Sequence, residues 1–219
     1  MENGQPPPSW EMEILYDDEE IVVINKPGGL LAVPGRGPDK QDCAAHRLRR
    51  LFPAMICQPA VHRLDMATSG LMVFAVTTGA QKKLSQQFAQ RRVDKGYLAV
   101  VQGIVAAPGG AIDLPLRLDP ANRPRQIYDP VHGKPSLSLW RRIAVEGDCS
   151  RIAWKPITGR THQLRVHAAH PLGLGAAIVG DSLYGSGREG GEMLLHATTL
   201  GFCHPKTGEP LRFISPPPF

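Results

Sequence analysis

The densest group of polar residues in the sequence lies just before an apolar stretch. His62-Arg63-Leu64-Asp65 is followed by the turn-forming run Thr68-Ser69-Gly70, and residues 71–76 are all apolar. A carboxylate in a loop at the mouth of a rigid strand is well placed for acid–base or nucleophilic chemistry. The local pattern alone favours a structural Asp65, which would accept hydrogen bonds from turn amides or pair with Arg63. Its role must therefore be decided by other parts of the chain.

A second polar group, residues 158–170, combines glycine, arginine and histidine. We expect a short helix over 161–170, on which His162 and Arg165 lie three residues apart and share a face. Arg160 lies near the start of this helix, where backbone N–H groups and a cation together could hold a phosphate. The group is thus a candidate for binding an anionic substrate.

The sequence contains no motif for a metal or a nucleotide cofactor. The histidines of the second group are spaced by five and three residues, unlike H-E-x-x-H, and no acidic residue is near them. The four cysteines form no C-x-x-C pair, so free thiols are expected. Neither a P-loop nor a dinucleotide-binding glycine motif occurs. We expect no metal and no cofactor; the histidines concerned are His162, His167 and His170.

Positive charge is concentrated in the later part of the chain. Residues 1–75 carry 7 Lys and Arg against 10 Asp and Glu, whereas residues 76–219 carry 18 against 10. This distribution favours a polyanion such as nucleic acid as partner, although a solvated basic surface explains it equally well. The three basic groups are Lys82, Lys83, Arg91, Arg92 and Lys95; Arg117, Arg123 and Arg125; and Arg151, Lys155, Arg160 and Arg165.

The elements that must position these residues are short strands and a few helices. Strands and helices occur in mixed order with hairpins, and 23 Gly and 21 Pro supply many turns. This order indicates an α+β fold with a mostly antiparallel or mixed sheet. Asp42 and Thr78 are the expected helix N-caps, and residues 106–125 are turn-rich. We expect strands over 13–16, 21–25, 71–77, 97–101, 137–145, 151–157, 193–202 and 211–214, and helices over 43–51, 78–90 and 161–170.

The chain length of 219 residues fits one domain. Residues 1–12 are polar and proline-rich, so we expect a flexible tail followed by a single domain over 13–219. The longest apolar run, residues 71–76, is too short to cross a bilayer, and the N-terminus does not look like a signal peptide. We therefore expect a cytoplasmic protein that does not interact with membranes.

Six stretches of the sequence together resemble the RluA-type pseudouridine synthase family. They occur in the family's order and at fitting distances, from about Ile14 to Phe219, and the nine residues His62–Gly70 match the signature H-R-L-D-x-x-T-S-G without a change. The loop over 167–178 is a few residues longer than usual, and Ala177 stands where the family commonly has proline. The matching stretches are Asn25–Leu30, His62–Gly70, Lys95–Ala99, Thr158–His167, Gly180–Gly185 and Leu195–Pro205.

The resemblance implies the family's fold and reaction. The fold is a bent, mixed and mostly antiparallel sheet with flanking helices and a central catalytic cleft, here without an S4 RNA-binding domain. The reaction isomerises uridine to pseudouridine in RNA without a cofactor. Among family members, the chain is most similar to one that modifies both 23S rRNA and tRNA, which implies a stem-loop of either RNA as substrate. The family also implies a monomer with no obligate protein partner.

The resemblance further implies a role for ten residues. Asp65 would act on the sugar or base, and Arg165 would pair with it. Tyr97 would stack on the uracil and help to remove the C5 proton afterwards. Arg63 would fill the space left when the target base flips out of its stack, a step that costs a few kcal/mol. The other implied substrate-binding residues are His62, Thr68, Arg160, His162, Gln163 and Leu195.

Two other functions are compatible with parts of the pattern. One is a non-catalytic RNA-binding protein or RNA chaperone on the same scaffold, against which the combination of Asp65, Tyr97 and Arg165 argues. The other is a metal-dependent hydrolase built on His162, His167 and His170, which the unsuitable spacing disfavours.

Overall fold

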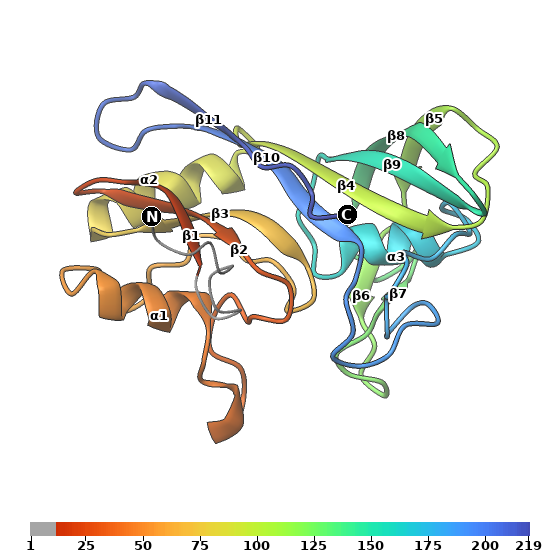
Figure 1. Ribbon diagram of the computed structural model, residues 1–219, viewed down its shortest axis with the longest axis horizontal. Coiled ribbons are helices and arrows are strands. Elements are labelled where there is room, and N and C mark those ends of the chain that lie inside the picture. Colours follow the sequence, from red (N-terminus) through yellow and green to blue (C-terminus); the bar gives the residue numbers. More distant parts are fainter. Residues whose placement is uncertain (1–11) are drawn as a thin grey trace, which may run out of the picture.

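A computed structural model describes residues 12–219 of the chain (Figure 1). The expected flexible tail over 1–12 lies outside the described residues except for Met12. Within them, a nine-stranded sheet in the order β1-β2-β3-β10-β4-β9-β8-β5, with β11 paired to β10, runs through both halves of the molecule. Its strands are β1 (Glu13–Asp17), β2 (Ile21–Lys26), β3 (Ser69–Ala75), β4 (Asp94–Gln102), β5 (Gly109–Asp113), β8 (Leu137–Glu146), β9 (Cys149–Pro156), β10 (Leu195–Cys203) and β11 (Pro210–Ile214).

The sheet has two halves, β1-β2-β3 and β4-β9-β8-β5, with β10 between them. They meet where β3 pairs with β10. This pair is the only parallel one in the sheet within residues 12–219, and its register joins Ser69 to His196 and Gly70 to Ala197. β10 then pairs with β4 on its other side in antiparallel register. The mixed, mostly antiparallel sheet expected from the sequence is therefore confirmed.

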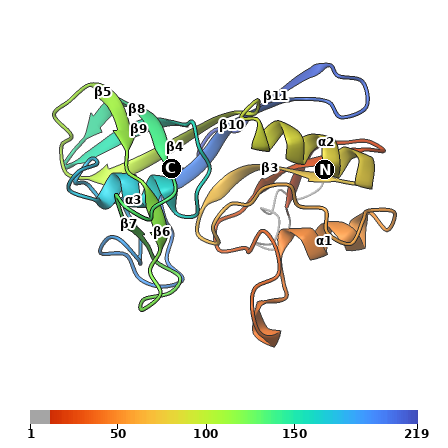
Figure 2. The same cartoon turned by 180° about the vertical axis from the view of Figure 1, so that it is seen from behind.

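Alternation along β2 and β3 explains how the first half of the molecule is filled. Val22 and Ile24 are buried on the side of α1 (Ala44–Leu51), whereas Ile21 and Val23 are buried on the side of α2 (Thr78–Ala89). Because successive side chains of a strand point to opposite faces, a sheet covered on both sides has apolar residues at every position. Figure 2 shows the two helices in the same half of the molecule as these strands.

The second half is built around β4, β9 and β8, with the short helix α3 (Gln163–Ala169) packed beside them. Ile152 and Trp154 of β9, together with Leu164 and Val166 of α3, belong to its apolar core. The short strands β6 (Leu116–Leu118) and β7 (Gln126–Tyr128) pair as a separate hairpin. In Figures 1 and 2 this hairpin and the segment around the 3-10 turn Pro38–Lys40 project on the same side of the molecule.

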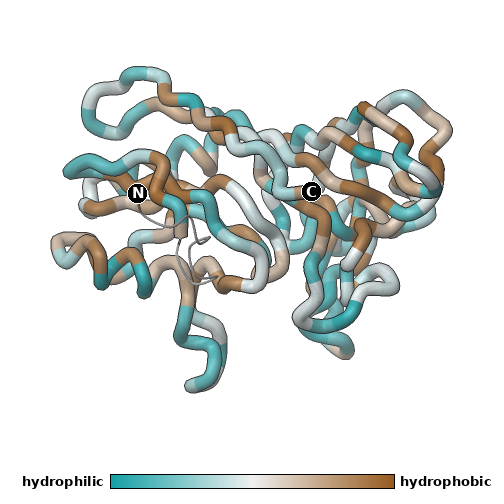
Figure 3. Tube along the Cα trace, in the orientation of Figure 1, coloured by the Kyte–Doolittle hydropathy of each residue, from teal (hydrophilic) through white to brown (hydrophobic). Residues whose placement is uncertain are grey.

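Hydropathy follows this architecture. Figure 3 shows hydrophobic residues along the central strands and hydrophilic residues in the two projections. None of the helices in residues 12–219 has the length and apolar character needed to cross a membrane.

Helix capping differs from the expectation by one residue at both N-termini. Cys43, not Asp42, is the N-cap of α1, and its Sγ accepts from the His46 N–H at 3.5 Å. Asp42 instead forms an ion pair with Arg47. Thr77, one residue earlier than expected, is the N-cap of α2 and accepts from the Ala80 N–H at 3.0 Å.

Other boundaries also differ from the expectation. The helix expected over 161–170 is restricted to Gln163–Ala169, because the preceding residue, His162, has a left-handed backbone with φ of 54°. β3 begins two residues earlier than expected and ends at Ala75. The turn-rich stretch over 106–125 contains β5 and β6, which local composition did not indicate because two Gly and four Pro among its twenty residues favour turns.

Candidate active site

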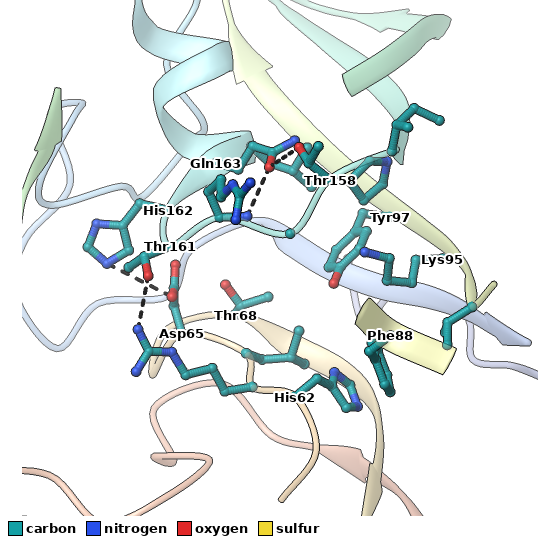
Figure 4. Close-up of a pocket in the computed structure, with 18 of the residues that line it drawn as sticks. His62, Asp65, Thr68, Phe88, Lys95, Tyr97, Thr158, Thr161, His162 and Gln163 are labelled. Atoms are coloured by element: carbon teal, nitrogen blue, oxygen red, sulfur yellow. Dashed lines mark hydrogen bonds and ion pairs between the residues drawn. The ribbon is translucent and has the colours of Figure 1, made fainter. Parts of the chain in front are cut away.

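A cleft of ≈ 450 Å³ opens at the junction of the two halves of the sheet (Figure 4). Three segments and Leu195 of β10 line it. The segments are the loop over 61–68 that leads into β3, the stretch over 88–97 from the end of α2 into β4, and the loop over 156–165 that leads into α3. The cleft therefore collects residues that are far apart in the sequence. All ten residues singled out from the sequence line it: His62, Arg63, Asp65, Thr68, Tyr97, Arg160, His162, Gln163, Arg165 and Leu195.

Asp65 lies beside the guanidinium of Arg165, in agreement with the expected pairing. Arg165 Nη1 is 3.4 Å from Asp65 Oδ2, and the side chains are 6% and 20% exposed, respectively. Arg165 is held more firmly from its other side, where Asp181 accepts from Nε at 2.8 Å and from Nη2 at 2.7 Å. Burial opposes the charge of Arg165, but the carboxylates of Asp181 and Asp65 raise the pKa of Arg165 above its usual value.

Asp181 is itself fixed by the backbone. Its Oδ1 accepts from the N–H groups of Leu183 at 2.8 Å and Tyr184 at 3.1 Å. Burial favours the neutral acid, but the Arg165 guanidinium and these N–H groups hold the pKa of Asp181 below its usual value. The result is a buried, bidentate ion pair that fixes Arg165 while Asp65 remains partly exposed.

Tyr97 lies across the cleft from Asp65 and Thr68, with its hydroxyl directed into the cleft (Figure 4). It is part of β4, where it pairs with Ala197 of β10 and Trp154 of β9. Burial and the negative charge of Asp65 raise the pKa of Tyr97, so the phenol is protonated at neutral pH. Its ring is a flat apolar surface at the floor of the site.

A buried lysine supports the loop that carries Asp65. Lys26 Nζ donates to the carbonyls of Pro27 and Leu30, both at 2.8 Å, and to that of Met66 at 3.2 Å. The Gly29 N–H also donates to the Met66 carbonyl, at 2.9 Å. Burial lowers the pKa of Lys26 to about 7, although the charge of Asp65 opposes this shift. Lys26 thereby ties the loop over 26–30 to the residue next to Asp65.

Two of the expected substrate-binding residues mainly hold the cleft walls together. His62 Nε2 accepts from the Val73 N–H at 3.1 Å, and its ring stacks on Phe88 with centroids 4.6 Å apart. Burial and the nearby Lys95 lower the pKa of His62 to about 3, so the ring is neutral. Gln163 Oε1 accepts from the Thr158 hydroxyl at 2.7 Å, and its Nε2 donates to the Ser138 hydroxyl at 2.8 Å.

The remaining expected residues face the cleft with polar groups or apolar surface. Arg63 lines it, and its Nη2 donates to Thr161 Oγ1 of the opposite loop at 3.0 Å. Arg160 Nε donates to the Pro135 carbonyl at 3.1 Å. Thr68 and Leu195 are buried in the wall.

The three histidines weighed as a metal site point to different places. His162 lies near Asp65, and His167 is fully buried. The His170 ring meets the Tyr128 ring edge-on, with the ring centroids 5.3 Å apart. Over residues 12–219, no group of three or more histidine, cysteine or acidic residues is arranged to hold a metal ion.

Sequence reasoning about single residues missed several members of the site. Lys95 and Arg91, expected only as members of a basic group, line the cleft. Lys26 supports the loop with Asp65, Asp181 binds Arg165, and Tyr184 contacts His162. Lys26, Lys95, Asp181 and Tyr184 each lie in one of the stretches that resemble the family, which is the signal that could have identified them.

Comparisons with known proteins agree with this geometry. The model of the RNA pseudouridylate synthase family matches residues 20–170. The dual-specificity RNA pseudouridine synthase RluA of Escherichia coli K12 is 42% identical, covering 100% of this chain and 99% of that protein. RluA of Yersinia pestis is 43% identical, covering 92% of this chain and 97% of that protein.

Solved structures show the same fold. Human RNA pseudouridylate synthase domain containing 1 superposes with a TM-score of 0.76 at 30% identity, covering 98% of this chain and 87% of that chain. Human RNA pseudouridylate synthase domain containing 4 shares the fold with a TM-score of 0.74 at 24% identity, covering 94% of this chain and 88% of that chain. The chain therefore belongs to the RluA-type RNA pseudouridylate synthase family and is an isomerase that converts uridine to pseudouridine in RNA.

Proposed function

We propose that this isomerase acts on specific uridines in a stem-loop of 23S rRNA, in the anticodon stem-loop of tRNA, or in both. The support for these substrates is the full-length similarity to enzymes named as dual-specificity synthases. We also propose that it works in the cytoplasm as a monomer, without a cofactor and without an obligate protein partner.

The observation that carries the mechanism is the position of Asp65. It is a partly exposed carboxylate beside a fixed guanidinium, in a cleft of ≈ 450 Å³. We propose that Asp65 starts the reaction, either by attack at C1′ or by removing a ribose proton. In either case the N1–C1′ bond breaks and the uracil turns before C5 bonds to C1′. When C5 bonds, an attacking Asp65 is displaced from C1′, whereas an Asp65 that removed a proton returns it to the same ribose carbon. The C5 proton is then lost, and N1 gains a proton.

Tyr97 and Arg165 complete the proposed catalytic group. Tyr97 would stack on the uracil and keep it against the sugar while it turns. The raised pKa of Tyr97 favours this role over that of a base, because the phenol enters the reaction protonated. Arg165 would hold Asp65 in position without neutralising it, since the guanidinium is shared with Asp181.

Arg63 is the residue we propose to occupy the space of the flipped base. It is exposed at the lip of the cleft, and its guanidinium spans the opening to Thr161. RNA entry would break this single hydrogen bond and release a planar cation that can stack on bases and bind phosphate. Arg91, Lys95 and Arg160, which line the cleft, would hold the RNA backbone.

Tritium release from RNA labelled at uridine C5 tests the proposal. We expect Asp65→Asn to abolish release while RNA affinity stays within a few-fold, because the carboxylate acts on the sugar and does not bind the phosphates, which dominate affinity. Asp148→Asn, a matched change in the exposed β8–β9 turn, should leave both unchanged. Turnover by Asp65→Asn at the rate of the unmodified enzyme would refute the mechanism.

A further inference from the structure

The segment between α3 and β10 brings a tyrosine hydroxyl to the back of His162. Tyr184 Oη accepts from the Gln126 backbone N–H at 2.6 Å and lies 2.8 Å from His162 Nδ1. Its ring meets that of His162 edge-on, with centroids 5.6 Å apart, and lies under the Arg165 guanidinium at 5.3 Å. The Tyr184 side chain is therefore held at three points: its hydroxyl by the Gln126 N–H of β7 and by the imidazole, and its ring by the Arg165 guanidinium.

Counting protons decides which group donates in the contact between Tyr184 and His162. The Gln126 N–H is a donor only, so the phenol oxygen accepts there. Burial raises the pKa of Tyr184 to about 12, so the phenol keeps its own proton. Within residues 12–219, His162 Nδ1 is the only acceptor in hydrogen-bond contact with that proton. The arrangement that uses every group has Tyr184 donating to His162 Nδ1.

This arrangement places the proton of His162 on its other nitrogen. Burial lowers the pKa of His162 below its usual value, so the ring is neutral and carries one proton. Its Nε2 is 3.9 Å from Asp65 Oδ1. An N–H at this position faces the carboxylate favourably, whereas a lone pair would face it unfavourably. Because 3.9 Å exceeds hydrogen-bond distance, the N–H still has room for another acceptor.

We infer that Tyr184 is a positioning residue that holds His162 as the Nε2–H tautomer, and that this N–H donates to the ribose 2′-hydroxyl oxygen of the target nucleotide. The choice of ligand atom rests on the proposed function, since Asp65 is proposed to act at the sugar. The 2′-oxygen is on the carbon next to C1′, so it lies close to any group that reaches C1′. The tautomer itself does not depend on the proposed function.

Ring ¹⁵N spectra of histidine-labelled protein near neutral pH test the tautomer directly. The His162 signals are assigned by their loss in His162→Gln. In the unmodified protein we expect a protonated Nε2 and an unprotonated Nδ1. In Tyr184→Phe, which removes only the hydroxyl, we expect a mixture of tautomers. Tyr128→Phe, a matched change in the neighbouring β7 strand, should leave the His162 signals unchanged.

The outcomes of this experiment separate the inference from the proposed function. A proton on Nδ1 in the unmodified protein would overturn the inference, as would an unchanged tautomer in Tyr184→Phe. Neither result depends on RNA or on turnover. Inactivity of the enzyme on rRNA and tRNA, by contrast, would refute the proposed function and leave the tautomer intact.

Single-turnover kinetics test the ligand atom. One hydrogen bond changes a rate by roughly two- to tenfold, so we expect Tyr184→Phe to slow the chemical step by about that factor with little change in RNA affinity. The same substitution should have no further effect in His162→Gln. Replacing the target uridine by 2′-deoxyuridine removes the proposed acceptor, so His162→Gln should slow the chemical step less on that substrate than on uridine. Multiplicative, independent effects of 2′-deoxyuridine and of His162→Gln on the rate would contradict the contact.

Discussion

Two carboxylates bind the Arg165 guanidinium unequally, and this difference explains why Asp65 stays available to substrate. Asp181 takes two short hydrogen bonds from the guanidinium, whereas Asp65 has one contact at 3.4 Å. Asp181 is buried and fixed by backbone N–H groups, while Asp65 is 20% exposed. The strong pair therefore orients the arginine, and the weak pair leaves the other carboxylate available to substrate.

Asp181→Asn tests this difference. The change removes the charge that compensates a buried guanidinium, so we expect the free energy of unfolding to fall by roughly 3 kcal/mol. We also expect turnover to fall by about a hundredfold or more, because Arg165 no longer has a fixed position beside Asp65. Urea unfolding and tritium release measure the two effects.

The control for this substitution is Asp119→Asn. Asp119 is a partly exposed aspartate that also accepts from a backbone N–H, that of Ala121, but holds no buried cation. Its replacement should leave the unfolding midpoint nearly unchanged. Equal stability of Asp181→Asn and the unmodified protein would show that Asp181 does not hold Arg165.

At the scale of elements, the parallel contact between β3 and β10 positions the cleft. The loop with Asp65 ends at Ser69, the first residue of β3, and Gly70 faces Ala197 across the junction. Gly70 has a φ of 111°, and a Cβ added there would lie 2.4 Å from the Ala197 carbonyl oxygen. The two strands can approach this closely only because glycine has no side chain.

Gly70→Ala should therefore separate the two halves of the sheet. We expect a loss of more than about 3 kcal/mol in the free energy of unfolding, since the added methyl group meets backbone atoms that cannot move aside. Gly147→Ala is the matched control: Gly147 has a φ of 60°, but nothing lies within 4 Å of an added Cβ. It should cost about 1 kcal/mol from backbone strain alone. Similar losses in both variants would contradict the close approach as the cause.

The sequence predicted the elements whose signals are local. The β1–β2 hairpin, the β8–β9 hairpin and the amphipathic helix α2 were expected from apolar alternation, turn residues and a threonine near the helix start. The position of β10 between β3 and β4 was not predicted, because no local signal records which distant strand a segment pairs with. The left-handed backbone of His162, which makes α3 begin two residues later than expected, was also missed, because no local pattern indicated it.

The candidate site was predicted to a similar extent. Matching motifs identified Asp65 and the residues around the cleft, and all of these line it. Lys26 and Asp181 were not singled out, because their roles depend on hydrogen bonds to residues 40 and 16 positions away, respectively. Partners at such distances are set by tertiary packing, which spacing in the sequence does not reveal.

The whole molecule keeps several histidines neutral in its interior. Burial lowers the pKa values of His167 and His196 to about 4. The unfolded chain binds protons at these side chains below about pH 6.5, before the folded protein does. The stability they contribute is therefore fully present above about pH 6.5 and is lost as the pH falls toward 4, by up to roughly 3 kcal/mol for each.

Urea unfolding at pH 7, 5.5 and 4.5 measures this dependence. We expect His196→Gln to flatten the loss of stability at low pH, because glutamine does not titrate and can still bond to Ser69 and Ser215, which flank the ring. His132→Gln, at an exposed histidine, should leave the slope unchanged. Identical pH slopes for His196→Gln and the unmodified protein would contradict a buried, neutral His196.

The place of β10 in the sheet has a consequence for synthesis of the protein. β10 joins β3 to β4, yet it begins only at Leu195, after every other strand except β11 has been made. While the ribosome is still translating earlier residues, the nascent chain has both halves but no strand between them. Assembly of the catalytic centre must therefore wait until β10 emerges from the exit tunnel, and the growing polypeptide cannot modify RNA before then.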